Sequence, residues 1–217
     1  IQALIITPIN HPLIAEKLGH LMDGGICVIT MNNDIEGSKR LCYVGSDYRK
    51  GGETACGMLG ILTGGSAKIG IVAGSRSVLG HQQRLDGFLG MKKERYPGFE
   101  IIDTIYTDDD EIESYDATTV MLREHPEMTA IFIVAGGVYG ACRAIMARGL
   151  AGKMKVVTFD KTPSTEELIK KRRDTSDDLP AALQPGERLH SKGIQLSGER
   201  RKTQKRLPLY EKRDSHL

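Results

Sequence analysis

No stretch of the 217 residues approaches the run of roughly 20 apolar residues that a helix needs to cross a bilayer. We therefore expect no membrane-spanning segment. The sequence also begins without an initiator methionine and without a basic leader, directly in the apolar stretch ALIIT from residue 3. Such a beginning is typical of a fragment, and we expect the true start of the protein to lie upstream.

The four cysteines lack the spacing of a metal site. Cys27, Cys42, Cys56 and Cys142 stand in apolar or helical surroundings, and no CxxC pair is present. We predict buried, unreactive thiols and no bound metal. Thiols without an evident disulfide partner also favour a reducing cytoplasm.

Motifs of catalysis are missing as well. The sequence has no GxSxG elbow, no Walker loop and no HExxH helix, and no nucleophile stands at a convincing spacing from a base. We predict that the protein is not an enzyme. The acidic run at residues 108–111 admits a cation site, but a solvated loop is the favoured interpretation.

Charge divides the chain into two parts. Residues 1–170 carry 18 basic and 21 acidic side chains, a net charge of −3, whereas residues 171–217 carry 12 and 7, a net charge of +5. The first part is therefore not a basic nucleic-acid surface. The second part has no sustained hydrophobic period. A disordered or non-native tail is favoured there over a tail that binds nucleic acid.

Strands and helices alternate along residues 1–171. Apolar runs predict strands within residues 3–10, 26–31, 41–45, 67–73, 99–106, 130–135 and 154–159. Between most of these runs the apolar residues recur at helical spacing. Strands that alternate with helices of about 10–15 residues are typical of βαβ units, so we predict an α/β fold built on parallel sheets.

Residues 67–88, AKIGIVAGSRSVLGHQQRLDGF, form the centre of the predicted site. An apolar strand ends at Ala73-Gly74-Ser75, and a polar helix start follows that carries Arg84. In open parallel sheets, ligands bind at the carboxyl ends of the strands. An arginine there offers five N–H donors that suit hydroxyls or carboxylates, whereas the alternative is an ordinary solvated helix arginine.

Further polar or small residues follow the other predicted strands. They are Asn32, Asn33, Asp109, Ala135, Gly136 and Asp160. With Arg84 they suit a ligand rich in hydroxyls, because each buried polar group that is left unpaired costs about 1–3 kcal/mol. We therefore predict a binding site for a small sugar or polyol.

The stretch AGGVYG at residues 135–140 admits a different ligand. It follows a strand, opens a helix and has Asp160 20 residues beyond its last glycine, as in a dinucleotide-binding fingerprint. Ala135 stands where the first glycine is expected, so we favour a loop kept small to let a ligand approach. No cofactor is predicted, and a nicotinamide-dependent oxidoreductase remains the alternative.

Several motifs, taken in order, resemble one known family. They are VITMNN, YVGSDYRKGG, HQQRLDGF, HPEMTAIFIVAGGVYGACRAI and KVVTFDKTPSTEELIKK. The series resembles the type I periplasmic-binding-protein fold, which ribose-type transport receptors share with the effector domains of LacI-type transcriptional regulators. The resemblance implies two α/β lobes, joined by three crossovers, with a sugar between them, here in a truncated form. It places a remnant of the first lobe at residues 1–46, most of the second at 47–171, and an aberrant basic tail, disordered or frame-shifted, at 172–217.

The resemblance also bears on single residues. Arg84 and Asp160 match the arginine and the aspartate that ribose-type receptors use at these positions. At three other places this sequence departs from the ribose-type receptors. Asn32-Asn33 replaces their Asp-Arg pair, Asp109 replaces an aromatic residue, and Ala135-Gly136 replaces their Asn-Asp pair. A sugar-like ligand is therefore implied, but not ribose in particular.

Two functions follow from the resemblance. The first is the effector-binding domain of a LacI-type regulator, a cytoplasmic homodimer that would bind DNA through a helix-turn-helix upstream of these residues. The alternative is an exported, periplasmic or cell-surface receptor of an ABC-type sugar transporter. The four thiols favour the regulator.

Overall fold

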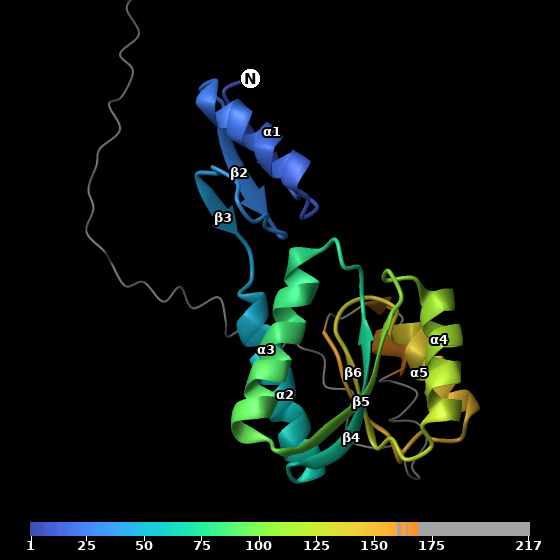
Figure 1. The fold of residues 1–217 in the computed structure, drawn as a ribbon. Coiled ribbons are helices and arrows are strands. Elements are labelled where there is room, and N and C mark those ends of the chain that lie inside the picture. The colour runs from blue at the N-terminus through green and yellow to red at the C-terminus, as the bar shows by residue number, and fades with distance from the viewer. Residues whose placement is uncertain (160–161, 164, 169–217) are drawn as a thin grey trace, which may run out of the picture.

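The structure is a computed structural model that describes residues 1–159, 162–163 and 165–168. Its first part is a three-stranded sheet of order β1-β2-β3 in which both pairings are parallel. The elements of this part are β1 (Ala3–Ile6), α1 (Pro12–Asp23), β2 (Cys27–Met31) and β3 (Cys42–Val44). The chain then leaves the first sheet through residues 45–47 (Figure 1).

The second part is a four-stranded sheet of order β5-β4-β6-β7, again parallel throughout. Its elements are α2 (Tyr48–Thr63), β4 (Ser66–Ala73), α3 (Leu79–Arg95), β5 (Gly98–Tyr106), α4 (Glu111–Glu124), β6 (Ala130–Ile133), α5 (Val138–Ala147) and β7 (Lys155–Val157). The predicted parallel α/β fold is confirmed, and every strand expected from the apolar runs is present.

Helices cover both faces of the second sheet. On one face α2 and α3 pack through Leu59 and Phe88, and the Phe88 ring stacks on that of Phe132 in β6 at 4.4 Å between centroids. On the other face α4 and α5 pack against Val72 and Ile133. The central strands β4 and β6 are thus buried on both sides, which explains why their sequences are nearly continuous apolar runs.

The helices α2 and α3 approach each other closely at Gly52. A Cβ atom at this position would lie 1.8 Å from the carbonyl oxygen of Arg84 and 2.8 Å from the amide nitrogen of Phe88. Helix α2 begins just before this contact, where the Asp47 carboxylate caps it by accepting from the Lys50 N–H at 3.0 Å. The bare backbone of Gly52 therefore sets the distance between the two helices that flank the site.

Among the described residues, α1 covers only one face of the first sheet. Helix α1 packs against Val28 on that face, with Leu18 as its most buried apolar contact. The opposite face carries Ile5, Met31 and Val44, whose exposed fractions are 62%, 48% and 55%. We call these three side chains, with their strands, the outward face of the first sheet.

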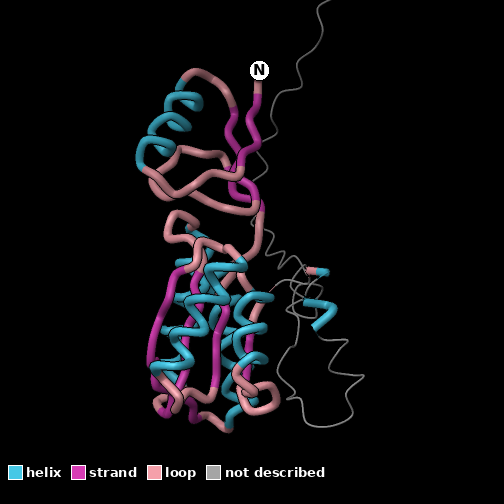
Figure 2. Tube along the Cα trace, turned by 90° about the vertical axis from the view of Figure 1, so that its right-hand side faces the viewer, coloured by secondary structure: helices cyan, strands magenta, loops and turns pink. Residues whose placement is uncertain are grey.

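The two sheets lie end to end. The arrowheads of β2 and β4 point toward each other in Figure 1, and Figure 2 shows the same arrangement from the side. Backbone contact joins the two parts, since the Asn10 N–H donates to the Ser77 carbonyl at 2.9 Å. The carboxyl ends of the strands of both sheets therefore face a common region.

The prediction of buried thiols is confirmed for two of the four cysteines and wrong for the other two. Cys56 and Cys142 are buried, but Cys27 is half-buried and Cys42 is exposed. Cys42 lies on β3, a strand at the edge of the first sheet, so neighbouring chain covers it less. Burial raises the pKa of both Cys56 and Cys142 to about 12.

These differences predict two classes of thiol. At pH 8 dithiobis(nitrobenzoate) should modify Cys42 at least about 100-fold faster than Cys56 or Cys142, since with a pKa near 12 only about one such thiol in 10,000 is ionised. The measurement is the absorbance time course in buffer and in denaturant. Cys42→Ser should remove the fast phase. Rapid modification of all four cysteines in the native protein would contradict the burial.

Some expectations lie outside the described residues. Asp160 and the tail at residues 172–217 are among them. Within the described ranges, no helix combines the length and the apolar character that a membrane crossing requires.

Candidate functional site

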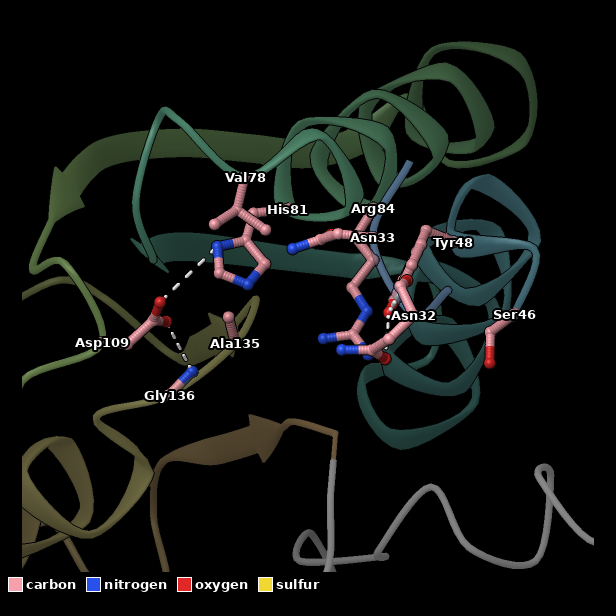
Figure 3. Close-up of a pocket in the computed structure, with 10 residues that line it drawn as sticks. All are labelled: Asn32, Asn33, Ser46, Tyr48, Val78, His81, Arg84, Asp109, Ala135 and Gly136. Carbon is pink, nitrogen blue, oxygen red and sulfur yellow. Dashed lines mark hydrogen bonds and ion pairs between the residues drawn. The ribbon is translucent and has the colours of Figure 1, made fainter. Parts of the chain in front are cut away.

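A pocket of about 210 Å³ opens where the strands of the two sheets end. This volume is below the roughly 300–1,000 Å³ of pockets for drug-sized ligands and suits a smaller molecule. The first sheet and its connection to α2 contribute one group of lining residues, and the loops and helices of the second part contribute the other. The lining residues, drawn in Figure 3, are Asn32, Asn33, Ser46, Tyr48, Val78, His81, Arg84, Asp109, Ala135 and Gly136.

The pocket brings together most of the residues singled out in the sequence. Those that line it are Asn32, Asn33, Arg84, Asp109, Ala135 and Gly136. The remaining one, Asp160, lies outside the described residues. Each lining residue of this group follows a strand, except Arg84, which stands in the second turn of α3.

Arg84 is held in one orientation by its surroundings. Its side chain is buried, and Nη1 donates a hydrogen bond of 2.8 Å to the carbonyl oxygen of Val134 at the end of β6. The guanidinium also lies over the Phe159 ring at 4.0 Å and over the Tyr48 ring at 4.9 Å. The alternative of a solvated helix arginine is therefore wrong, and Arg84 is a preorganised cation at the pocket wall.

Asn32 joins the first sheet to the second part of the chain. Its carbonyl oxygen accepts from the hydroxyl of Tyr48 at 2.8 Å and from that of Tyr43 at 2.9 Å. Burial, followed by the nearby Tyr48, raises the pKa of Tyr43 to about 12, so its hydroxyl stays a donor at neutral pH. The Asn32 backbone has a φ of 62°, a left-handed conformation that asparagine tolerates better than most residues. The residue therefore holds a turn that places its amide at the pocket.

The acidic run at residues 108–111 binds backbone N–H groups. Asp110 caps α4 by accepting from Ile112 and Glu113, each at 2.8 Å. Asp109 accepts from Gly136 at 2.9 Å, and Glu111 accepts from Gly140 at 2.6 Å. The favoured interpretation of a solvated loop is thus incomplete, because three of its carboxylates order local structure. Among the described residues, no cluster of three or more His, Cys, Asp or Glu is placed to hold a metal ion.

The same contacts count against a dinucleotide at residues 135–140. A pyrophosphate would need the backbone N–H groups at the start of α5. Two of those groups, on Gly136 and Gly140, already donate to carboxylates. The negative charge of Asp109 and Glu111 would also repel the pyrophosphate. These contacts make the loop a poor site for the nicotinamide cofactor of the alternative interpretation.

Four lining residues were not expected from the sequence. They are Ser46, Tyr48, Val78 and His81. A signal existed for one of them, since His81 precedes Arg84 by three residues and so shares its helix face. Tyr48 gave no such signal, because its role depends on how α2 meets the end of β2.

Comparison with known proteins identifies the family of this fold. A family model described as periplasmic binding protein domain matches residues 1–176. The chain belongs to the periplasmic binding protein family. Its fold is the two-lobe, type I form of that family, as predicted. The match ends at residue 176, a few residues beyond residue 171, where the alternation of strands and helices ceases in the sequence.

The relatives of this periplasmic binding protein domain are sugar-binding proteins. The D-ribose/D-allose-binding protein of Pseudomonas aeruginosa is 28% identical over 183 residues, which cover 80% of this chain and 56% of the relative. The ribose import binding protein RbsB of Bacillus subtilis is 25% identical over 174 residues, which cover 80% and 55%. This chain thus spans little more than half the length of these curated relatives.

A solved structure of similar fold carries a bound sugar. It is an ABC transporter periplasmic solute binding protein from Actinobacillus succinogenes with bound D-allose, which is 26% identical to this chain. The TM-score is 0.69, and the alignment covers 78% of this chain and 63% of the other. These names support the transport alternative better than the transcriptional regulator that the thiols favoured.

Proposed function

We propose that the chain forms part of a solute-binding receptor for an ABC-type sugar transporter and binds its ligand without transforming it. The observation that carries this proposal is the pocket, which takes residues from both parts of the chain. Asn32 comes from the end of the first sheet, and Arg84 and Gly136 come from the second part. The relatives add support, because one is a D-ribose/D-allose-binding protein and another is a ribose import binding protein.

The two sheets support a division into lobes. We propose that residues 1–46 belong to the first lobe and residues 47–171 to the second, with the tail at 172–217 outside both. The three-stranded sheet ends at Val44 and the helix that opens the second part begins at Tyr48, so the boundary falls in the connection between them.

The ligand that suits this pocket carries several hydroxyls. Arg84 supplies fixed N–H donors, and the amides of Asn32 and Asn33 supply both donors and acceptors. Such groups must be matched by polar atoms of the ligand, since unpaired polar groups are costly to bury. We propose a monosaccharide. Ribose and allose, which the names of the relatives give, are the first candidates, and arabinose, a stereoisomer of ribose, is the third.

The transport proposal replaces the regulator interpretation, and with it the homodimer, the DNA partner and the cytoplasmic location. Partner proteins would be components of a transporter, and the receptor would act outside the cytoplasm. The upstream coding sequence distinguishes the two functions. A signal peptide or lipobox there would support the receptor, and a helix-turn-helix would revive the regulator.

Sugar binding is tested by isothermal titration calorimetry on the product of the complete gene. We expect at least one of D-ribose, D-allose and D-arabinose to bind with a micromolar or lower Kd, because fixed polar groups from two lobes would then enclose it. NAD serves as a negative control and should give no heat of binding. A folded protein that binds none of the three sugars would contradict the proposed ligand class.

A further inference from the structure

His81 and Asp109 lie beside each other on one wall of the pocket. The Nδ1 atom of His81 lies 3.7 Å from Oδ2 of Asp109, and the two side chains are 16% and 33% exposed. The other carboxylate oxygen, Oδ1, accepts from the N–H of Gly136 at 2.9 Å. Both oxygens of Asp109 are therefore directed at groups of the protein.

Two glycines leave the space that this pair occupies. A Cβ atom on Gly74 would lie 2.3 Å from Oδ1 of Asp109 and 2.7 Å from Nδ1 of His81, and one on Gly136 would lie 2.7 Å from Cβ of Asp109. Asp109 itself adopts a φ of 67°, which is uncommon for a residue other than glycine. The loops after β4, β5 and β6 thus converge on one carboxylate, and the arrangement is built by the chain.

The orientation of the imidazole follows from this carboxylate. A negative charge beside Nδ1 favours the state of the ring that carries a proton on that nitrogen. In the neutral ring, Nε2 is then an acceptor. Figure 3 shows this second nitrogen pointing away from Asp109, into the space toward Ala135 and Arg84.

We infer that His81 is a specificity-determining residue that accepts a hydrogen bond from a ligand hydroxyl through Nε2, and that Asp109 is a positioning residue for it. This inference rests on the proposed sugar-binding function. It assigns Asp109 a different role from that expected from the sequence, where the carboxylate itself contacts the ligand. His81 and Arg84, one turn apart on α3, then bind neighbouring polar atoms of the same molecule.

The test is calorimetry on the product of the complete gene, with the tightest binder of D-ribose, D-allose and D-arabinose as the probe. His81→Leu should weaken binding about 10- to 30-fold, since the hydroxyl then loses its acceptor. His81→Gln, which keeps a polar group near Nε2, should recover part of this loss. His20→Leu is the matched control, because His20 is 72% exposed on α1, and it should leave Kd unchanged.

The positioning role has its own readout. Asp109→Asn keeps an oxygen for Gly136 but no longer favours a proton on Nδ1, and it should weaken binding about 3- to 10-fold. In the His81→Leu background, Asp109→Asn should raise Kd by less than about 2-fold, because the ring that Asp109 positions is absent. An equal effect in both backgrounds would overturn the positioning role.

The pH dependence of sugar affinity distinguishes a hydrogen bond from the ligand to Nε2 of His81 from a merely structural role of this residue. Lowering the pH from 8 to 5 should weaken sugar binding in the parent, since protonation of Nε2 removes the acceptor, and should not do so in His81→Gln. Among the described residues that line the pocket, the other charged or titratable groups near the imidazole are Asp109, Arg84 and Tyr48. If the parent binds a sugar and Arg84→Ala abolishes binding, but both His81 variants bind like the parent, this inference is wrong while the proposed function stands.

Discussion

Replacing Arg84 with alanine is expected to weaken sugar binding at least about 100-fold. The variant loses donors that the pocket holds in place through Val134 and Phe159, and no neighbouring cation among the lining residues replaces them. Charge-assisted hydrogen bonds contribute about 1.5–3 kcal/mol each, and an arginine makes more than one. Calorimetry with the three monosaccharides measures the loss.

Two further variants make the Arg84 result specific. Arg84→Lys keeps the charge but not the planar fork, so it should recover only a small part of the affinity. Arg76→Ala is the matched control, since Arg76 is exposed on the loop that precedes α3, lies over the Tyr106 ring and does not line the pocket. It should change Kd by less than about 2-fold. Unchanged affinity in Arg84→Ala would show that the sugar binds elsewhere.

Arg84→Ala also carries a cost in stability. The Val134 carbonyl would lose its donor inside the protein, and the free energy of unfolding should fall by about 1–3 kcal/mol. Circular dichroism at the temperature of the titration therefore accompanies the binding measurement, so that loss of affinity is read only from folded protein.

The largest effect on stability is expected at Gly52. Gly52→Ala places a methyl group within 1.8 Å of the Arg84 carbonyl, which belongs to the backbone of α3 and cannot move by itself. The two helices must separate, so the free energy of unfolding should fall by about 3 kcal/mol or more. Urea denaturation measures the change. Sugar affinity should fall as well, because the clash is with the residue that carries the guanidinium.

Gly90→Ala is the control for this substitution. Gly90 is exposed in α3, and an added Cβ there meets no atom within 4 Å. Alanine should therefore stabilise the protein by about 0.5–1 kcal/mol through its higher helix propensity. If Gly52→Ala were as stable as Gly90→Ala, the close approach of α2 to α3 would be refuted.

Much of the fold could be predicted because the central strands of its second sheet are buried. The strands β4 and β6 are buried on both faces, so their sequences stand out as apolar runs ended by glycine or polar residues. The exposure of Cys42 could not be predicted in this way. It depends on β3 being an edge strand, and strand order comes from tertiary contacts that a local pattern does not contain.

The candidate site was predicted in outline, but the roles of its residues were not. Strand ends point to Asn32 and Asp109, because in a parallel sheet these ends share one edge. The burial of Arg84 was indicated but not decided by the sequence. Arg84 precedes the buried Phe88 by four residues and therefore shares its helix face. The partners of Asp109, His81 and Gly136, had no such signal, because they come from helix α3 and from the loop after β6.

The choice between regulator and receptor lay outside the reach of these residues. Both classes share one fold, and the four thiols were weak evidence for a cellular location. The relatives, which are sugar-binding proteins and include a ribose import binding protein, changed the preference.

The outward face of the first sheet bears on how the protein behaves at high concentration. Parallel sheets are normally covered on both sides, yet here Ile5, Met31 and Val44 remain open to water. An open row of aliphatic side chains beside an edge strand is a template for adhesion between molecules. We expect any preparation that leaves this surface uncovered to aggregate and to need low protein concentrations or solubilising additives.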